Sequence, residues 1–365
     1  MIGRRDALKW LGAGIASTVL PRPGAAAPQF PKGAIIRTVL KDLPPEALTG
    51  GATLFHEHLS LAPDFMPRWM SLARSLFPAS GPPRNPPPPA QPAQPHFMQD
   101  ADLMAGEMSA AAKDGVACIV DGGHPDMGRD LEFLKEISTK SGLPIVAGCG
   151  YYAQPFYPPE VAAWDEDRIV EELIRQANTQ PVGALGEIGT WDVMTADERK
   201  VFRAVGRTHR ATNLAIFTHT NFGKGALDQL DLLESVGVNP GRAAIGHIGG
   251  LTDPKLEVPK AICKRGAFVG FDRQGGPADG TQVKLVMALV EAGHADQLLF
   301  SSDFSTGGGQ LKRNGGPGYA KTVTVFAPKL REAGVDEKML RGILVDNPRR
   351  LLAFVPKQTN PGFRA

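Results

Sequence analysis

The chain has 365 residues, of which 42% are hydrophobic and 21% are charged. This is the composition of an ordinary globular protein, and the length suffices for one large hydrophobic core. The formal net charge is only +2 at pH 7, and no apolar stretch is long enough to cross a bilayer, so no membrane span is expected.

The first 27 residues are typical of a signal peptide for the twin-arginine (Tat) export route. The pair Arg4-Arg5 precedes an apolar run at 11–20, and the small residues at 25–27 supply a cleavage site. Cleavage there would remove four basic residues and one acidic residue, so the formal net charge of +2 becomes −1. A nearly neutral mature protein has no electrostatic attraction to nucleic acid or to an anionic membrane. We expect a periplasmic protein whose folded domain spans residues 28–365.

The cysteines of the chain are Cys118, Cys149 and Cys263, which is an odd number. The first two lie in or beside apolar runs. Buried free thiols are therefore a better interpretation than a disulfide framework. An exported protein without disulfides fits a route that carries proteins already folded.

The first elements after the signal peptide are a short predicted strand at 35–40 and a second one at 52–59. Residues 78–95 follow, and this segment contains nine prolines. Such a segment cannot form a helix or a central strand. We interpret it as a surface loop inserted after the strand at 52–59, and both a lid over the active face and an idle insertion remain open.

Beyond this loop, short apolar runs alternate with amphipathic stretches. With 52–59 the runs number eight, and the other seven are 116–121, 145–148, 182–187, 215–219, 243–247, 267–271 and 298–303. Helices are predicted at 102–113, 130–138, 165–178, 196–212, 227–235, 259–265, 280–292, 319–333 and 336–353. This alternation indicates an α/β fold, a (β/α)8 TIM barrel. A doubly wound open sheet is the alternative. The barrel is preferred because polar residues occur at the C-terminal ends of successive strands.

His56 and His58 lie two residues apart at the end of the strand at 52–59. Side chains alternate along a strand, so both rings point to the same face, about 7 Å apart along it. Two imidazoles so placed can converge on one metal ion. Ordinary strand ends also carry such pairs, so the partners elsewhere in the chain decide the interpretation.

Further ligand-type side chains stand at the ends of four other predicted strands. They are Glu187, His219, His247 and Asp303. In a barrel all these ends surround one mouth, where active sites are built. Four imidazoles and two carboxylates are too many for one tetrahedral ion and suit two divalent ions that share a bridge. His209 and His294 lie in or near helical stretches and are expected at the surface.

Several short motifs are specific when taken together. They are Thr53-Leu54-Phe55-His56-Glu57-His58-Leu59, Gly128-Arg129-Asp130, Gly186-Glu187-Ile188-Gly189, Ile245-Gly246-His247, Gly270-Phe271-Asp272-Arg273, Ser302-Asp303 and Asn347-Pro348. Over nearly all of the mature sequence the chain resembles the phosphotriesterase family of the amidohydrolase superfamily. By this resemblance His56, His58 and Asp303 would hold the more buried of two ions. His219 and His247 would hold the more exposed ion, and a carboxylate and a hydroxide would bridge the two.

The sequence departs from the best-known members of that family at the bridge. Those members use a carboxylated lysine on the fourth barrel strand. Residues 183–189 contain no lysine. Glu187 stands in that place, as in the phosphotriesterase-homology branch of the family.

The expected chemistry follows from two zinc-type divalent ions about 4 Å apart, which would generate hydroxide at neutral pH and polarise the oxygen under attack. Asp303 can ligate one ion and accept the proton of that hydroxide. Tyr152 and Arg273 resemble positions that line the lactone pocket of relatives. Arg273 would bind a departing oxyanion or, alternatively, form a rim salt bridge. Trp191 and Phe271 follow strands and are expected either to wall the substrate pocket or to pack in the interior.

These observations predict a binuclear metal-dependent hydrolase that acts on an ester bond of a small molecule, either a phosphoester or a lactone. An amidohydrolase acting on a C–N bond is a second interpretation. A barrel that holds metal or ligand without turnover is a third, and the complete set of ligand residues argues against it. Since members of the family are often dimers, we expect a homodimer.

Overall fold

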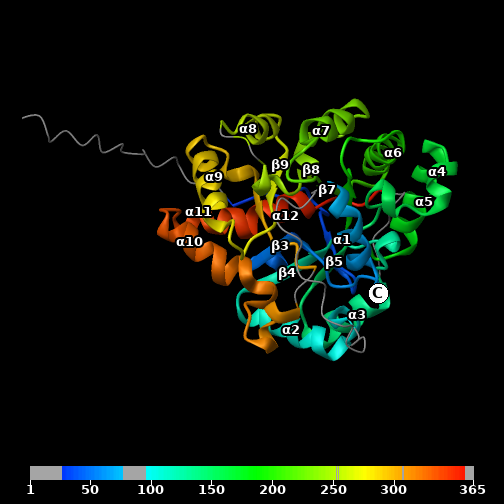
Figure 1. Ribbon diagram of the computed structural model, residues 1–365. Helices are drawn as coiled ribbons and strands as arrows, with labels where there is room; N and C mark the ends of the chain where they lie inside the picture. Colours follow the sequence, from blue (N-terminus) through cyan, green and yellow to red (C-terminus); the bar gives the residue numbers. More distant parts are fainter. Residues whose placement is uncertain (1–26, 77–95, 252, 254, 306–307, 358–365) are drawn as a thin grey trace, which may run out of the picture.

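Eight parallel strands form the centre of the computed structural model, which describes residues 27–76, 96–251, 253, 255–305 and 308–357 (Figure 1). In chain order the strands are β3 (Ala52–Glu57), β4 (Val116–Asp121), β5 (Ile145–Ala147), β6 (Ala184–Gly189), β7 (Ala215–His219), β8 (Ala243–Ile245), β9 (Phe268–Phe271) and β10 (Leu298–Phe300). The Pro-rich segment and residues 1–26 of the predicted signal peptide lie outside the described residues.

The strands pair in chain order, as a (β/α)8 barrel requires. One sheet has the order β3-β4-β5 and the other β10-β9-β8-β7-β6, with all neighbours parallel. A parallel bridge between Ala147 and Val182 connects the two sheets. On the opposite side, the amide of Asp303 donates to the carbonyl oxygen of His56 at 3.2 Å, which connects β10 to β3. The predicted barrel is confirmed, and the open sheet is not.

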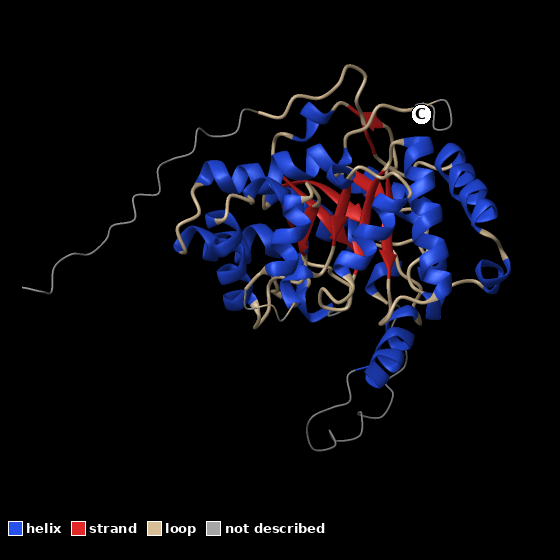
Figure 2. Ribbon diagram, turned by 90° about the horizontal axis from the view of Figure 1, so that it is seen from above, coloured by secondary structure: helices blue, strands red, loops and turns tan. Residues whose placement is uncertain are grey.

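Helices surround the strands (Figures 1 and 2). They are α1 (Phe65–Leu76), α2 (Ala101–Lys113), α3 (Leu131–Ser141), α4 (Pro159–Ala163), α5 (Glu166–Thr179), α6 (Ala196–Thr212), α7 (Ala226–Ser235), α8 (Glu257–Lys264), α9 (Asp279–Glu291), α10 (Ala327–Glu332), α11 (Glu337–Arg341) and α12 (Asn347–Leu352). Local caps set their ends. Thr195 and Glu198 form a reciprocal capping box at the start of α6, and Asn213 ends that helix in the left-handed conformation.

Strand alternation divides the apolar core into two layers. One set of side chains fills the barrel, and it includes Phe55, Val120 and Phe217. The alternate residues, such as Leu54 and Ile216, belong to the larger layer between strands and helices. The period is interrupted near the end of β3, where the pairing with β4 shifts register between Leu54 and Glu57, so that His56 faces inward beside its neighbour Phe55.

An antiparallel hairpin, β1 (Ile36–Arg37) and β2 (Asp42–Leu43), precedes the barrel. It lies at the amino ends of the strands, since the amide of Val39 in its turn donates to the carbonyl oxygen of Ile145 at 2.8 Å. The predicted strand at 35–40 is therefore only two residues long. The chain reverses within the range where a continuous strand was expected.

Two predicted helices near the C-terminus are interrupted. The range predicted at 319–333 contains a π-helical segment, Thr322–Phe326, and the range at 336–353 contains another, Gly342–Asp346. Each π segment ends two residues before a proline, Pro328 or Pro348. Proline has no N–H to donate and its ring crowds the preceding turn, so the regular hydrogen-bond ladder is broken there.

His209 is not at the surface as predicted. It lies on α6 with only 7% of its surface exposed. Its Nδ1 lies 2.6 Å from the carbonyl oxygen of Leu214, so the ring is satisfied inside the protein. The helical pattern did not reveal this because α6 packs on the barrel with several polar residues inward. The prediction of buried free thiols is confirmed for Cys118, Cys149 and Cys263.

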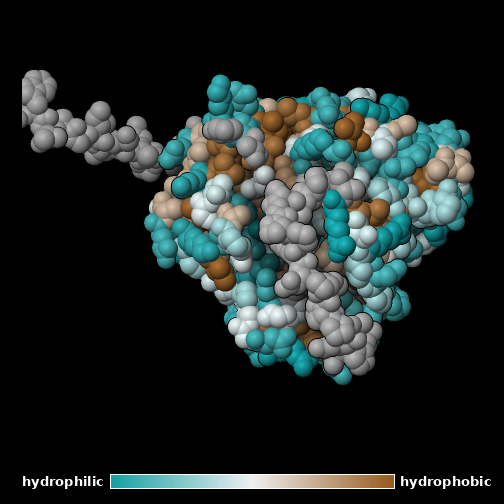
Figure 3. All heavy atoms as spheres, viewed as in Figure 1, coloured by the Kyte–Doolittle hydropathy of each residue, from teal (hydrophilic) through white to brown (hydrophobic). Residues whose placement is uncertain are grey.

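The described surface is mostly hydrophilic in the view of Figure 3, with hydrophobic residues gathered near α8 and α9. Large hydrophobic side chains that are exposed in the described residues are Met70, Val193, Phe222 and Val355. None of the helices in this part of the chain is both long and apolar enough to span a bilayer.

Candidate metal centre

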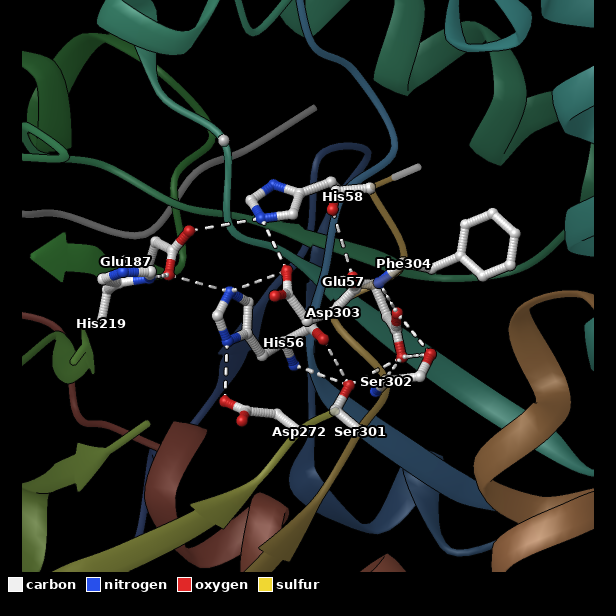
Figure 4. A network of polar contacts seen from close by, with 12 residues as sticks. His56, Glu57, His58, Glu187, His219, Asp272, Ser301, Ser302, Asp303 and Phe304 are labelled. Atoms are coloured by element: carbon white, nitrogen blue, oxygen red, sulfur yellow. Dashed lines mark hydrogen bonds and ion pairs between the residues drawn. The ribbon is translucent and has the colours of Figure 1, made fainter. Parts of the chain in front are cut away.

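The end of β3 places two histidines in the barrel interior and one glutamate outside it. His56 and His58 are buried, with ring centroids 5.4 Å apart. Glu57, between them, points the other way and accepts hydrogen bonds from Ser301, Ser302 and the amide of Phe304 (Figure 4). The carboxylate therefore fastens β3 to the segment that carries Asp303.

Gly122, after β4, allows the two rings to approach the barrel wall. A Cβ atom at this position would lie 3.1 Å from ring carbons of both His56 and His58. Any larger residue would have to displace the rings. The glycine is thus part of the site although it offers no ligand atom.

The predicted ligand residues converge. Ligand atoms of His56, His58 and Asp303 lie within 4.8 Å of one another, and so do those of a second group, Glu187, His219 and His247. Glu187 faces both groups. Its Oε1 lies 3.3 Å from Nε2 of His58, and its Oε2 lies 3.1 Å from Nδ1 of His219.

Asp303 lies between the two groups. Its Oδ1 is 3.2 Å from Nε2 of His58, and its Oδ2 is 3.9 Å from Nε2 of His247. Asp303 and His247 have φ angles of 47° and 59°, in the left-handed region that non-glycine residues seldom adopt. Such backbone persists only where the surrounding structure holds it, and it is concentrated at functional sites.

The carboxylates make the centre attractive to cations. Burial alone would lower the pKa of His58, but the contacts with Asp303 and Glu187 raise it to about 10. Burial likewise opposes the charge of Asp303, yet His58 and the field of His247 lower the pKa of its carboxyl to about 2. Without metal, a proton on His58 supplies part of the positive charge that two ions would otherwise supply.

Glu187 is also held ionised. Burial favours its neutral form, but the fields of His56 and His219 keep the pKa of Glu187 well below the ordinary glutamate value. We attribute this chiefly to His56, because burial and the neighbouring His247 lower the pKa of His219 to about 4 and leave that ring neutral.

A divalent ion fits these residues. Nε2 of His56 is buried and has no hydrogen-bond partner among the described residues, although a Glu187 oxygen lies 3.2 Å away. An orphaned ring nitrogen beside a carboxylate is suited to ligate an ion. The donor set of imidazoles and carboxylates is the one that zinc binds in catalytic sites.

Asp272 is a residue of the site whose role was not predicted. It follows β9, and its Oδ2 accepts from Nδ1 of His56 at 3.0 Å, while its Oδ1 accepts from Nδ1 of His247 at 2.8 Å. Both rings then present Nε2 to the interior of the ligand set. The signal was present, since Asp272 is a polar residue at a strand end like the ligands themselves.

Tyr152, predicted to line the substrate pocket, lies beside the second ligand group. Its hydroxyl oxygen is 3.3 Å from the ring nitrogens of His219 and accepts from Nε1 of Trp69 at 2.9 Å. Trp191 packs edge-on against Trp69, with ring centroids 5.7 Å apart, and the same distance separates Trp191 from Phe156. An aromatic wall therefore borders one side of the site, and α1, which carries Trp69, was not predicted.

Arg273 and Phe271 differ in where they lie. Nε of Arg273 is 3.6 Å from Oδ2 of Asp303, and its guanidinium lies over the ring of Phe222. The side chain of Phe271 is buried between strands and helices, where it packs on Phe300. It is not at the mouth, because adjacent residues of a strand face opposite sides and Asp272 takes the inward position.

A model of the phosphotriesterase family matches residues 36–352. The chain belongs to this family. Members of the phosphotriesterase family are hydrolases that depend on a binuclear metal site.

Individual relatives of the phosphotriesterase family catalyse different reactions. The chain is 32% identical to a phosphotriesterase homology protein of Escherichia coli, over 66% of this chain and 85% of that protein. It is 25% identical to the N-acetyltaurine hydrolase of Rattus norvegicus, over 87% of this chain and 98% of that protein. A solved structure of a lactonase from Listeria monocytogenes matches with a TM-score of 0.73 and 25% identity, covering 87% of this chain and 98% of that one.

Proposed function

We propose that this protein is a binuclear metal-dependent hydrolase that cleaves an ester bond, either a phosphoester or a lactone. The observation that carries this proposal is the carboxylate of Glu187, whose two oxygens face different histidines, His58 and His219. One carboxylate between two ligand groups is suited to bridge two ions. Zinc is the ion we propose, from the imidazole and carboxylate donors.

The chain's own residues take distinct parts in this reaction. When bound, the two ions supply a water that is activated at neutral pH and polarise the oxygen of the bond under attack. Asp303 accepts the proton of the attacking water, since its carboxylate lies between both ligand groups and is ionised. Arg273, beside Asp303, binds the oxyanion that departs. Tyr152 donates its hydroxyl hydrogen to the substrate. The phenol oxygen accepts from Nε1 of Trp69, and this contact leaves the hydrogen of the hydroxyl available.

Amide hydrolysis is the second candidate. It is supported by the similarity to an N-acetyltaurine hydrolase that extends over 87% of this chain. The same metal pair and the same proton acceptor serve an amide, provided that a proton reaches the departing nitrogen. Asp303 would return the proton it has accepted.

A hydrolysis panel tests these alternatives. The mature protein is assayed with lactones, phosphate esters and N-acyl amino compounds, each with and without prior removal of metal by a chelator. We expect chelator-sensitive turnover that is fastest with a lactone or a phosphoester. Fastest turnover of N-acyl compounds would replace the ester proposal with the amide one, and activity indifferent to the chelator would refute both.

We also propose that the protein acts in the periplasm as a homodimer. Export rests on the Arg4-Arg5 pair and the apolar run behind it. The proposal of a dimer rests only on the frequent occurrence of dimers among members of the family. Light scattering of the purified mature protein measures its mass, and a monomer would contradict the dimer without affecting the proposed reaction.

A further inference from the structure

We propose that His124 and Asp126 form a positioning pair that fixes Glu187 and Tyr152 relative to each other. The pair thereby sets the affinity for the second ion, the one that the group Glu187, His219 and His247 would hold. The inference rests on the proposed function, since it concerns the same centre. Neither residue is a predicted ligand. Both follow β4, in the stretch Gly122 to Asp126.

The two side chains connect three strand ends. Nε2 of His124 lies 2.8 Å from the carbonyl oxygen of Glu187 in β6. Nδ1 of His124 lies 2.6 Å from Oδ1 of Asp126. The other carboxylate oxygen of Asp126 accepts from the amide of Tyr152, after β5, at 2.8 Å.

The hydrogens in this chain of contacts can be assigned. A carbonyl oxygen only accepts, so Nε2 of His124 must carry a hydrogen and donate it to Glu187. A second hydrogen lies between Nδ1 and the carboxylate of Asp126, because two bare acceptors would repel at 2.6 Å. Both side chains are completely buried. Hydrogen bonds of this kind are stronger away from water, and breaking one leaves the remaining buried group without a hydrogen-bond partner.

The pair leaves the Glu187 peptide little freedom. Its N–H donates to the carbonyl oxygen of Gly122 at 3.2 Å, and its C=O accepts from His124. Tyr152 is held in a similar way, by Asp126 at its amide and by Trp69 at its hydroxyl. The carboxylate of Glu187 and the phenol of Tyr152, both beside His219, therefore keep one relative position.

Ordinary packing is the alternative, and His209 provides its matched control. Like His124, His209 is buried and has a ring nitrogen facing a main-chain carbonyl oxygen, that of Leu214. It lies on α6 and has no contact with the ligand groups in the described structure. Replacing either ring by phenylalanine removes one buried imidazole contact to a carbonyl, and at His124 it also removes the contact with Asp126.

The test compares ion affinity in matched variants of the mature protein. The variants are His124→Phe, His124→Gln, Asp126→Leu, Asp126→Asn and His209→Phe. Binding of Zn²⁺ is measured by competition with a chromophoric chelator. The visible spectrum of the Co²⁺-loaded protein reports ligand geometry independently of activity, and kcat and KM are measured separately.

We expect His124→Phe to lower the affinity for the second ion by about 10- to 100-fold, the usual effect of losing a group that orients a ligand. Its cobalt spectrum should change and its kcat should fall. His124→Gln should recover part of the loss, because its amide can still donate to the Glu187 carbonyl. Asp126→Asn should have an ion affinity near that of wild type, since an amide can accept from Tyr152 and donate to His124. Asp126→Leu can do neither, and its ion affinity should fall.

His209→Phe should lower Tm but keep the ion affinity and cobalt spectrum of wild type. The inference is overturned if His124→Phe and Asp126→Leu bind both ions like His209→Phe. If His124→Phe does not fold, the comparison of His124→Gln with the two Asp126 variants decides in the same way. If wild type binds two ions and the variants bind them equally well, only this inference is refuted. If wild type binds no ion, the proposed function is refuted as well.

Discussion

The carboxylate of Asp272 lies 3.0 Å from Nδ1 of His56, on the side of the ring opposite the other ligand groups. This contact fixes a hydrogen on Nδ1 and leaves Nε2 free to ligate. The same carboxylate accepts from Nδ1 and from the main-chain amide of His247. One buried acid therefore orients a ligand from each of the two groups.

Asp272→Asn should weaken ion binding by roughly 10- to 100-fold. An amide has one acceptor oxygen, so its NH₂ group would face an N–H of His56 or His247 and turn that ring away. Asp279→Asn is the matched control, because Asp279 is also a buried acid but binds Lys329 and two loop amides. Equal ion affinity in the two variants, measured by chelator competition, would show that Asp272 does not orient the rings.

The purified mature protein should contain close to two divalent ions per chain by elemental analysis. His58→Ala and His247→Ala, one from each ligand group, should each lower that number and abolish hydrolysis. Because the pKa of His58 is raised to about 10 without metal, binding must displace a proton. Affinity should therefore fall as the pH is lowered from about 10 through the neutral range, and calorimetry in two buffers should detect the released protons. Binding without proton release would contradict the assigned charges.

Asp303→Asn should keep most of the metal but lose turnover by roughly 10²- to 10⁴-fold, the contribution typical of a positioned proton acceptor. The amide oxygen still ligates weakly, whereas it cannot take the proton. Steady-state kinetics should show the loss in kcat rather than in KM. Near-normal turnover with full metal content would assign the proton to another group.

Glu187→Gln should bind the second ion far more weakly, since the amide keeps the shape of the side chain but not its charge. Metal-free wild type should regain activity on addition of metal alone, at a rate unaffected by bicarbonate, because glutamate brings its own two oxygens. A carboxylated lysine would require carbon dioxide. A clear bicarbonate requirement, or two tightly held ions in Glu187→Gln, would mean that another group forms the bridge.

Replacing Arg4 and Arg5 together by lysine should leave the full-length precursor in the cytoplasm, since the twin-arginine route reads the pair. Fractionation followed by immunoblotting measures the distribution of precursor and mature protein. A variant with lysine at Arg22, outside the pair, is the control. Unchanged export of the double variant would indicate the general secretory route.

The alternation of strands and helices could be predicted from the sequence, because apolar periodicity is a local property. β4, β7 and α6 begin and end where predicted. The candidate ligands His56, His58, Glu187, His219, His247 and Asp303 were predicted from their places at strand ends, and the structure brings them close together. α1 was not predicted, because it follows β3 directly and leads into the Pro-rich segment, where a helix was not sought.

The partners of those ligands depend on tertiary contacts. Asp272 is 216 residues from His56 along the chain, and His124 is 63 residues from the carbonyl of Glu187 that it holds. No local pattern relates such pairs, since the barrel closes only when all eight strands are in register. The same closure placed Phe271 against the helices, where a one-residue step along the strand reverses the facing side.

The sequence by itself determined the types and the order of the candidate ligands, because metal chemistry needs particular side chains and the barrel collects strand ends at one mouth. Only the tertiary structure decided which nitrogen each ring presents, which oxygen of Glu187 meets which histidine, and that Arg273 lies against Asp303. Those choices depend on distances of about 3 Å between residues far apart in the chain, and packing of the whole barrel sets such distances.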